Sequence, residues 1–152
     1  QIDFLVGTFG KAIASVGGYI ICDSIIRDYL INKMRPLIFS TALPPISMAW
    51  SDFIFNKVLS MQQQRQHLAE ISQYLQQAVI AKGFSSPSSS HIIPVIVGES
   101  QAAIEKARYV QQQGFYAMPV RPPTVPQNSS RLRISLTALV QKNELQQLVE
   151  CL

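Results

Sequence analysis

The feature that most restricts the fold is the run of residues 46–82, which contains neither proline nor glycine. Within it, apolar side chains recur close to the helical period, which is typical of an amphipathic helix. They are Val58, Met61, Leu68, Ile71, Leu75 and Val79. The glutamines between them indicate a solvated helix face rather than a low-complexity tract. The run therefore predicts one long helix with room for a single break, and we expect it to begin a domain that spans residues 46–152.

The rest of this domain has the pattern of a small α+β unit. In order, the predicted elements are a loop at 85–90, a strand at 92–97, a helix from Ser100 to about Gln113, a strand at 115–120, a loop at 122–130, a strand at 132–136 and a last helix with Leu145, Leu148, Val149 and Leu152. Ser100 is expected to cap its helix and Gly114 to end it. Strands and helices in this order favour one compact unit.

The first 45 residues have a different pattern. Residues 4–6 and 18–22 predict neighbouring strands joined by a tight, glycine-rich connection, and a helix follows Asp23. Residues 37–41 predict a short extended run, which the two prolines at 44 and 45 stop. The sequence opens without methionine inside an apolar strand. We therefore expect a piece of a longer protein, in which residues 1–45 are the remnant of a larger domain.

Composition and charge narrow the class of protein. The chain is 47% hydrophobic and 14% charged, with a formal charge of +4, which excludes a disordered chain. Its longest uncharged stretches are too short or too rich in proline to cross a bilayer, which takes about 20 apolar residues. Two cysteines make no disulfide framework and favour a reducing cytoplasm. The basic residues are scattered, so a small anionic ligand is favoured over nucleic acid.

Lys11 is the first candidate for chemistry. It follows Gly10, but only two residues separate Gly7 from Gly10 and Ala12 follows the lysine, so the segment is not a nucleotide-binding P-loop. Small residues around Lys11 leave room for a bulky group on its amine, and partial burial would favour the neutral, nucleophilic form. These are the requirements of a Schiff base, although an ordinary turn lysine is the alternative.

Several motifs resemble one family. They are Thr8-Phe9-Gly10-Lys11, Gly17-Gly18, residues 37–45 (Leu-Ile-Phe-Ser-Thr-Ala-Leu-Pro-Pro), residues 121–126 (Arg-Pro-Pro-Thr-Val-Pro) and residues 131–138 (Arg-Leu-Arg-Ile-Ser-Leu-Thr-Ala). In order and spacing they resemble the α-oxoamine synthases that depend on pyridoxal phosphate (PLP). The resemblance spans nearly the whole chain. It implies an α/β fold, the fold-type I of PLP-dependent transferases, represented here by its C-terminal portion: the last strands of the large domain and an α+β small domain.

The resemblance implies roles for residues of the first segment. Lys11 would hold PLP as an internal aldimine, and Thr8 would contact the phosphate of the cofactor. Thr41, assisted by Ser40, would reach the phosphate in a partner subunit. The implied enzyme is therefore a homodimer with shared active sites. Without the motif, Thr8 and Thr41 would be read as ordinary β-branched strand residues.

Two residues of the second segment are candidates for substrate binding. Arg131 and Arg133 share one face of a predicted strand, opposite Leu132, and a guanidinium grips a carboxylate through two parallel hydrogen bonds. The resemblance assigns Arg133 to the α-carboxylate of the amino acid and Thr124 to the acyl-donor end. A solvent-facing arginine pair is the alternative. The Pro-Pro-Thr-Val-Pro loop is similar to that of 8-amino-7-oxononanoate synthases.

Other candidates point to structure rather than chemistry. His67 and His91 have no ligand partners at metal spacing, so no metal site is predicted and both are expected at the surface. Cys22 is expected in the core, and Trp50 and Phe53 as packing anchors. The aspartate and histidine that the family places against the PLP ring have no counterparts in this sequence, since they precede the lysine strand.

The resemblance implies an acyltransferase that condenses L-alanine with pimeloyl-CoA or pimeloyl-ACP, with decarboxylation, to 8-amino-7-oxononanoate in biotin synthesis. One alternative is glycine C-acetyltransferase, with glycine and acetyl-CoA. The other is a non-catalytic fragment or dimerisation module. The 152-residue chain alone is expected to be inactive.

Overall fold

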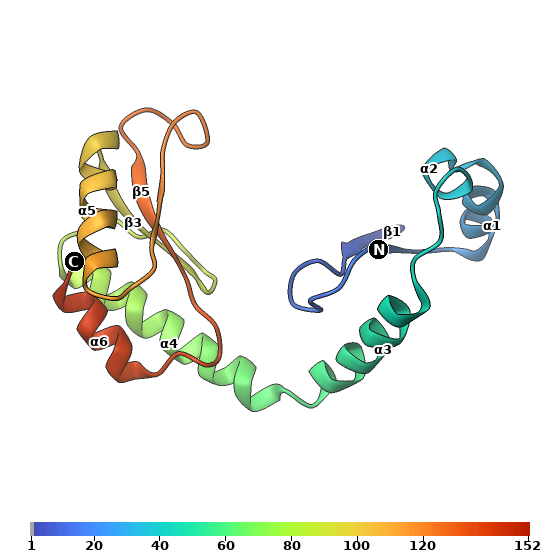
Figure 1. Ribbon diagram of the computed structural model, residues 1–152, viewed down its shortest axis with the longest axis horizontal. Coiled ribbons are helices and arrows are strands. Elements are labelled where there is room, and N and C mark those ends of the chain that lie inside the picture. The colour runs from blue at the N-terminus through green and yellow to red at the C-terminus, as the bar shows by residue number, and fades with distance from the viewer. Residues whose placement is uncertain (1) are drawn as a thin grey trace. The chain divides into compact units, whose positions relative to one another are not determined.

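The computed structural model describes residues 2–152, and Gln1, the first residue of the predicted 1–45 segment, lies outside them. The chain forms two compact units, Gln1–Met61 and Gln62–Leu152. Figure 1 labels most of their elements. The units divide after Met61, whereas the predicted domain boundary lies after Pro45, so the helix in between belongs with the first unit. The assignment of the two parts to a large and a small domain stays a prediction.

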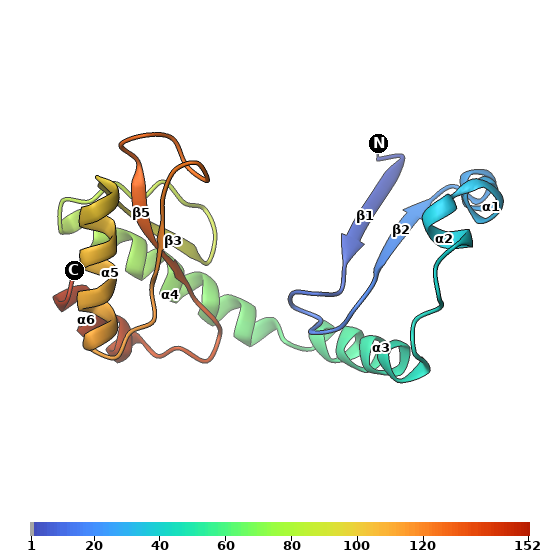
Figure 2. The same ribbon diagram turned by 45° about the horizontal axis from the view of Figure 1, so that its top comes forward.

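The first unit contains a two-stranded sheet and three helices. Strands β1 (Phe4–Thr8) and β2 (Gly18–Cys22) lie side by side in Figure 2. They pair antiparallel, from Phe4 opposite Cys22 to Thr8 opposite Gly18. The pair is the one that the sequence predicts, and the connection between the strands, residues 9–17, is a folded loop rather than a tight turn. The helices are α1 (Ser24–Lys33), α2 (Arg35–Ile38) and α3 (Pro45–Leu59).

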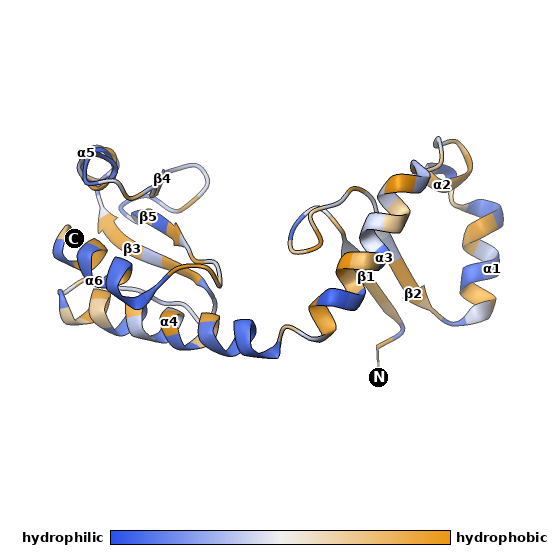
Figure 3. Ribbon diagram, turned by 60° about the horizontal axis from the view of Figure 1, so that its bottom comes forward, coloured by the Kyte–Doolittle hydropathy of each residue, from blue (hydrophilic) through white to orange (hydrophobic). Residues whose placement is uncertain are grey.

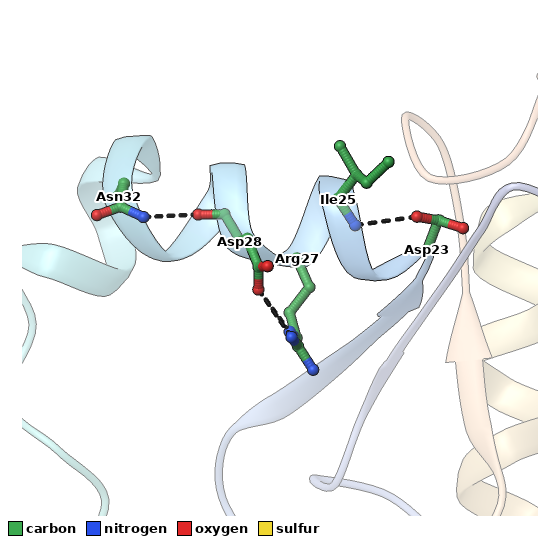
Figure 4. Close-up of polar contacts among 5 residues, drawn as sticks. All are labelled: Asp23, Ile25, Arg27, Asp28 and Asn32. Carbon is green, nitrogen blue, oxygen red and sulfur yellow. Dashed lines mark hydrogen bonds and ion pairs between the residues drawn. The ribbon is translucent and has the colours of Figure 1, made fainter.

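Side-chain hydrogen bonds fix the ends of α1 (Figure 4). The Asp23 carboxylate accepts a hydrogen bond from Ile25 N at 2.9 Å, so it caps a helix start that would otherwise leave amide donors without partners. Such a cap contributes about 1 kcal/mol. The Arg27–Asp28 ion pair at 2.8 Å is exposed and adds little. Asn32 Nδ2 donates to Asp28 O at 2.7 Å.

The extended run predicted at residues 37–41 is wrong. Its first residues, Leu37 and Ile38, belong to the short helix α2, and the chain turns immediately afterwards. Pro36 explains the difference, because proline is compatible with the first turn of a helix, where its missing N–H has no intrahelical acceptor. The Ser40 hydroxyl donates to Pro36 O and closes the turn.

The first unit has no hydrophobic core of its own. Among residues 2–61 the buried class contains Ser51 alone, and apolar side chains on every element are exposed. They include Phe4, Val6, Ile21, Ile25, Phe39, Ile46 and Phe53. The hydrophobic colouring of β1, β2 and α3 in Figure 3 therefore marks apolar surface that these residues leave uncovered.

The second unit is a three-stranded antiparallel sheet covered by helices (Figure 1). Its elements are α4 (Gln62–Ala81), β3 (Ile92–Gly98), α5 (Ser100–Gln112), β4 (Met118–Val120), β5 (Ser130–Ser135) and α6 (Lys142–Glu150). The strand order is β3-β5-β4, so β5 is central. The α+β unit that the sequence predicts is confirmed.

Alternating residues of the sheet and one face of each helix form the core. The sheet contributes Ile93, Val95, Leu132 and Ile134, α4 contributes Ile71, Leu75 and Val79, and α5 and α6 contribute Ala107, Val110, Leu145 and Leu148. The helical period predicted for residues 46–82 is therefore the one that buries α4. Side chains on the opposite face of β5 point away from this core.

The single break for which the sequence leaves room lies at Ser60 and Met61, between α3 and α4. Two other local predictions need correction. The strand predicted at 115–120 shrinks to β4, because Phe115 N donates to Val110 O and so closes the end of α5. The residue before α5 is Glu99, so Ser100 is not its cap; the Ser100 hydroxyl lies 3.1 Å from Ser130 Oγ instead.

No helix within residues 2–152 has the length and apolar character needed to cross a bilayer.

The distribution of the core predicts that the two units differ in stability when separated. Residues 62–152 expressed alone should unfold cooperatively in urea, whereas residues 1–61 alone should show no cooperative transition, because too little apolar surface is buried. Circular dichroism with urea titration measures both. In the 62–152 fragment, Leu75→Ala should lower the free energy of unfolding by about 2–5 kcal/mol. Ile80→Ala, on the exposed side of the same helix, is the control and should cost little. A cooperative transition in 1–61 would contradict this assignment of the core.

Candidate active site

The loop that carries Lys11 is closed by its own backbone. Phe9 N donates to Gly17 O at 3.0 Å and Ser15 N donates to Phe9 O at 2.9 Å, so the loop begins and ends as an extension of the β1–β2 pair. At its tip Ala14 N donates to Lys11 O at 2.9 Å. The strands thus present Lys11 on an ordered turn three residues after Thr8.

Helix α3 braces this loop through polar contacts. Trp50 Nε1 donates to Ile13 O and Ala14 O at 3.2 and 3.1 Å, and Ser51 Oγ lies 2.8 Å from Ser15 Oγ. The sequence indicates Trp50 only as a packing anchor beside Phe53, whose ring centroid is 6.0 Å away. Its indole N–H is the signal that could have revealed the brace, since this donor needs an acceptor when it packs against the chain. Nothing in the sequence around Ser51 predicts its contact with Ser15.

Two glycines allow the strands and the loop to approach closely. At Gly18 an added Cβ would lie 2.6 Å from Gly7 O, a backbone atom that cannot move aside. Gly17 has a φ of +91°, a region that side chains disfavour, and an added Cβ there would lie 2.6 Å from Leu43 Cδ1. The Gly17-Gly18 pair of the motif therefore has a steric role that its sequence position alone does not show.

The Lys11 side chain is exposed, so the partial burial expected of it is not found. Its small neighbours do leave space around the amine, as expected, but none of the residues 2–152 covers it enough to bury it.

The other predicted residues of the first unit do not converge on Lys11. Thr8 lines a cavity of about 480 Å³ between the two strands and α1, together with Tyr19 and Leu30. Ser40 and Thr41 lie in the exposed chain between α2 and α3, and neither lines this cavity. Their roles stay predictions.

The second unit does bring two predicted residues together. Thr124 and Arg133 line one cavity of about 520 Å³, along with Arg131. As the alternation along the strand predicts, Leu132 is buried while the two arginines point to the other face of β5. Arg131 is half-buried and its Nε donates to Ser129 O at 2.9 Å, whereas Arg133 is exposed. The lining of the cavity contains no carboxylate, so it is suited to an anion.

The other residues that the sequence singles out lie in surroundings that indicate no catalytic role. A ring nitrogen of His67 lies 2.9 Å from Val140 O and the residue is half-buried, so its expected surface position is only partly right; His91 is exposed as predicted. Cys22 is half-buried rather than in a core. Across residues 2–152, no three His, Cys, Asp or Glu side chains group in a way that could hold a metal ion.

The close approach at Gly18 gives a testable consequence. Gly18→Ala should weaken the β1–β2 pairing, because the new methyl group meets Gly7 O. Amide hydrogen exchange of residues 4–8 should then speed up relative to the unchanged chain. Gly10→Ala is the matched control, since its Cβ would have only Ser15 O at 3.8 Å, an ordinary contact. Equal exchange in the two variants would show that the steric argument is wrong.

Comparison with known proteins agrees with these features. A family model described as Aminotransferase class I and II matches residues 1–152. The 8-amino-7-oxononanoate synthase of Haemophilus ducreyi is 55% identical over the whole chain, which covers 40% of that protein. The chain spans about 40% of the length of the curated relatives it matches.

Solved structures agree on the fold. The serine palmitoyltransferase of Sphingomonas wittichii superposes with a TM-score of 0.90 at 29% identity, over 99% of this chain and 38% of that one. The 8-amino-7-oxononanoate synthase of Francisella tularensis gives a TM-score of 0.86 at 24% identity, over 97% and 44%, and supports the fold alone. A further structure is of serine palmitoyltransferase with PLP. The fold predicted from the motifs, a C-terminal portion of a PLP-dependent transferase, is confirmed. The chain belongs to the class I and II aminotransferase family.

Proposed function

We propose that this chain supplies part of the active site of a PLP-dependent acyltransferase that makes 8-amino-7-oxononanoate. Its substrates are L-alanine and pimeloyl-CoA or pimeloyl-ACP, and carbon dioxide is released, in the cytoplasmic synthesis of biotin. The observation that supports this most is the 55% identity, over the whole chain, to a relative with that name. The lysine loop and the acid-free arginine cavity supply the chemistry that such a reaction needs.

The donor set of the first unit fits PLP. Lys11 offers an exposed primary amine for the aldehyde of the cofactor, and Thr8 and Thr41 offer hydroxyls for its phosphate. The Ser40 hydroxyl, which donates to Pro36 O in this structure, would assist after turning from that acceptor. When bound, PLP supplies an electron sink that stabilises negative charge at the α-carbon of the amino acid. Thr41 and Ser40 are assigned to the phosphate bound by a partner subunit, which makes the enzyme a homodimer with shared sites.

The remaining steps are carried by side chains of this chain. Arg133 grips the carboxylate of alanine through its planar guanidinium, which orients the bond to the α-carbon. Lys11 Nζ, once it is free of the cofactor, removes the α proton and later returns a proton. Thr124, across the same cavity from Arg133, contacts the acyl donor.

The lysine assignment is tested by covalent trapping. The full-length protein is incubated with PLP and reduced with borohydride, and peptides are mapped by mass spectrometry. We expect a pyridoxyl adduct on Lys11 that disappears in Lys11→Ala. Lys33→Ala, which removes an exposed lysine of α1, is the control and should keep the adduct. An adduct on any other lysine would contradict the assignment of Lys11 as the lysine that binds PLP.

Product analysis then separates the proposed reaction from glycine C-acetyltransferase. The same full-length protein is given alanine with pimeloyl-CoA, or glycine with acetyl-CoA, and the amino ketones are identified. We expect the first pair to react with the higher kcat/KM. Preference for the second pair would replace the proposed reaction with the alternative. The 152-residue chain alone should show no turnover.

The role of Arg133 gives a kinetic prediction. Arg133→Ala should lower kcat/KM for alanine by about 10- to 100-fold, because a charge-assisted hydrogen bond is worth about 1.5–3 kcal/mol. Arg108→Gln, an exposed arginine on α5 outside the cavity, is the matched control and should keep the value of the unchanged enzyme. An unchanged kcat/KM in Arg133→Ala would remove the arginine from the site.

A further inference from the structure

The arginine cavity has more positive charge than one substrate carboxylate needs. Arg131 and Arg133 both line it, and it contains no Asp or Glu side chain. Neither arginine makes an ion pair with any group of residues 2–152. In the proposed function Arg133 binds the carboxylate of the amino acid. A ligand for Arg131 must then be a different anionic group, and its identity rests on that proposed function.

Arg131 is held in place by the backbone, but most of its guanidinium donors have no hydrogen-bond partner among residues 2–152. It lies on the central strand β5, opposite Ile96 of β3 and Val120 of β4, and it is half-buried. Its Nε donates to Ser129 O at 2.9 Å, which fixes the plane of the guanidinium. Among residues 2–152 its two terminal nitrogens have no hydrogen-bond partner. A half-buried cation with four unused donor hydrogens favours an anionic ligand.

The spacing of the two arginines argues for two separate anionic groups. The Cα atoms of residues i and i+2 of a strand are about 6.5–7 Å apart, so two arginine side chains that extend in parallel from them leave room for two carboxylates. Each fork can therefore grip its own carboxylate with two parallel hydrogen bonds. The cavity, at about 520 Å³, has room for two small substrate groups side by side.

We propose that Arg131 is a specificity-determining residue that binds a carboxylate at the far end of the acyl donor. The cavity then selects acyl thioesters that end in a free acid over neutral acyl thioesters, including the corresponding methyl ester. Thr124, assigned to the acyl donor in the proposed function, lines the same cavity.

Binding to the 152-residue chain tests this without any catalysis. The probes are heptanedioate monomethyl ester, which has one free acid, and the dimethyl ester, which has none. They are followed by amide chemical shifts of β5 in titrations of Arg133→Gln, which leaves Arg131 as the arginine of the cavity lining, and of the same chain with Arg131→Gln or Arg108→Gln added. We expect Arg133→Gln, with or without Arg108→Gln, to bind the monoester about tenfold more tightly than the diester, a difference of about 1.4 kcal/mol. Adding Arg131→Gln should abolish that preference while the core resonances keep their positions. Equal binding of the two probes by Arg133→Gln, binding of neither, or a preference that survives the addition of Arg131→Gln would overturn the proposal.

Kinetics of the full-length protein give a second, independent readout. The ratio of kcat/KM for pimeloyl-CoA to that for its ω-methyl ester should fall about tenfold in Arg131→Gln, with the change in KM for the acyl donor rather than for alanine. Arg131→Lys keeps the charge and should restore part of the ratio, which a purely structural role would not predict. A change in the KM for alanine alone would assign Arg131 to the amino acid instead and overturn the proposal. If the full-length protein transfers no acyl group at all, the proposed function fails, while the titrations still decide what Arg131 binds.

Discussion

The alternation of side chains along β5 is the constraint on which the second unit depends. Because β5 is the central strand, Leu132 and Ile134 complete a core made by three helices, and the same geometry forces Arg131 and Arg133 onto the other face. Packing and chemistry are therefore coupled in one strand. The burial of two aliphatic side chains determines the face of the sheet on which two cations lie.

The first unit is organised by hydrogen bonds rather than by a core. Antiparallel pairing and the contacts from Trp50 and Ser51 hold the lysine loop, and Asp23 caps α1, while apolar side chains stay at the surface. Such contacts are worth about 1 kcal/mol each in net terms, far less than a buried aliphatic cluster. They can define the local shape of the loop, but the stability of this unit requires further apolar burial.

Sequence patterns predicted the elements whose causes are local. The alternation of β5, the helical period of α4 and the residues of β2 could all be read from neighbouring residues. What the sequence could not show depends on distant atoms. Trp50 donates to carbonyls 36 and 37 residues away, and Lys11, expected to be partly buried, is exposed. The extended run predicted for residues 37–41 is wrong because Pro36 fits the first turn of a helix. The same limit applies to the site: the motifs identified Arg133 and Thr124, and only the fold brought them into one cavity.

The two-stranded sheet of the first unit has a consequence for handling the chain. Among the described residues, β1 and β2 pair only with each other, so each keeps an outer edge of unpaired amides and carbonyls beside exposed Val6 and Ile21. Open edges with apolar side chains are templates for adding strands from other molecules. Self-association through β-strand addition is thus the expected route to precipitation of this chain. Natural sheets often carry a charged residue on an open edge. A charged substitution on the edge of β1 or β2 would raise the solubility of this chain more directly than a change to the core.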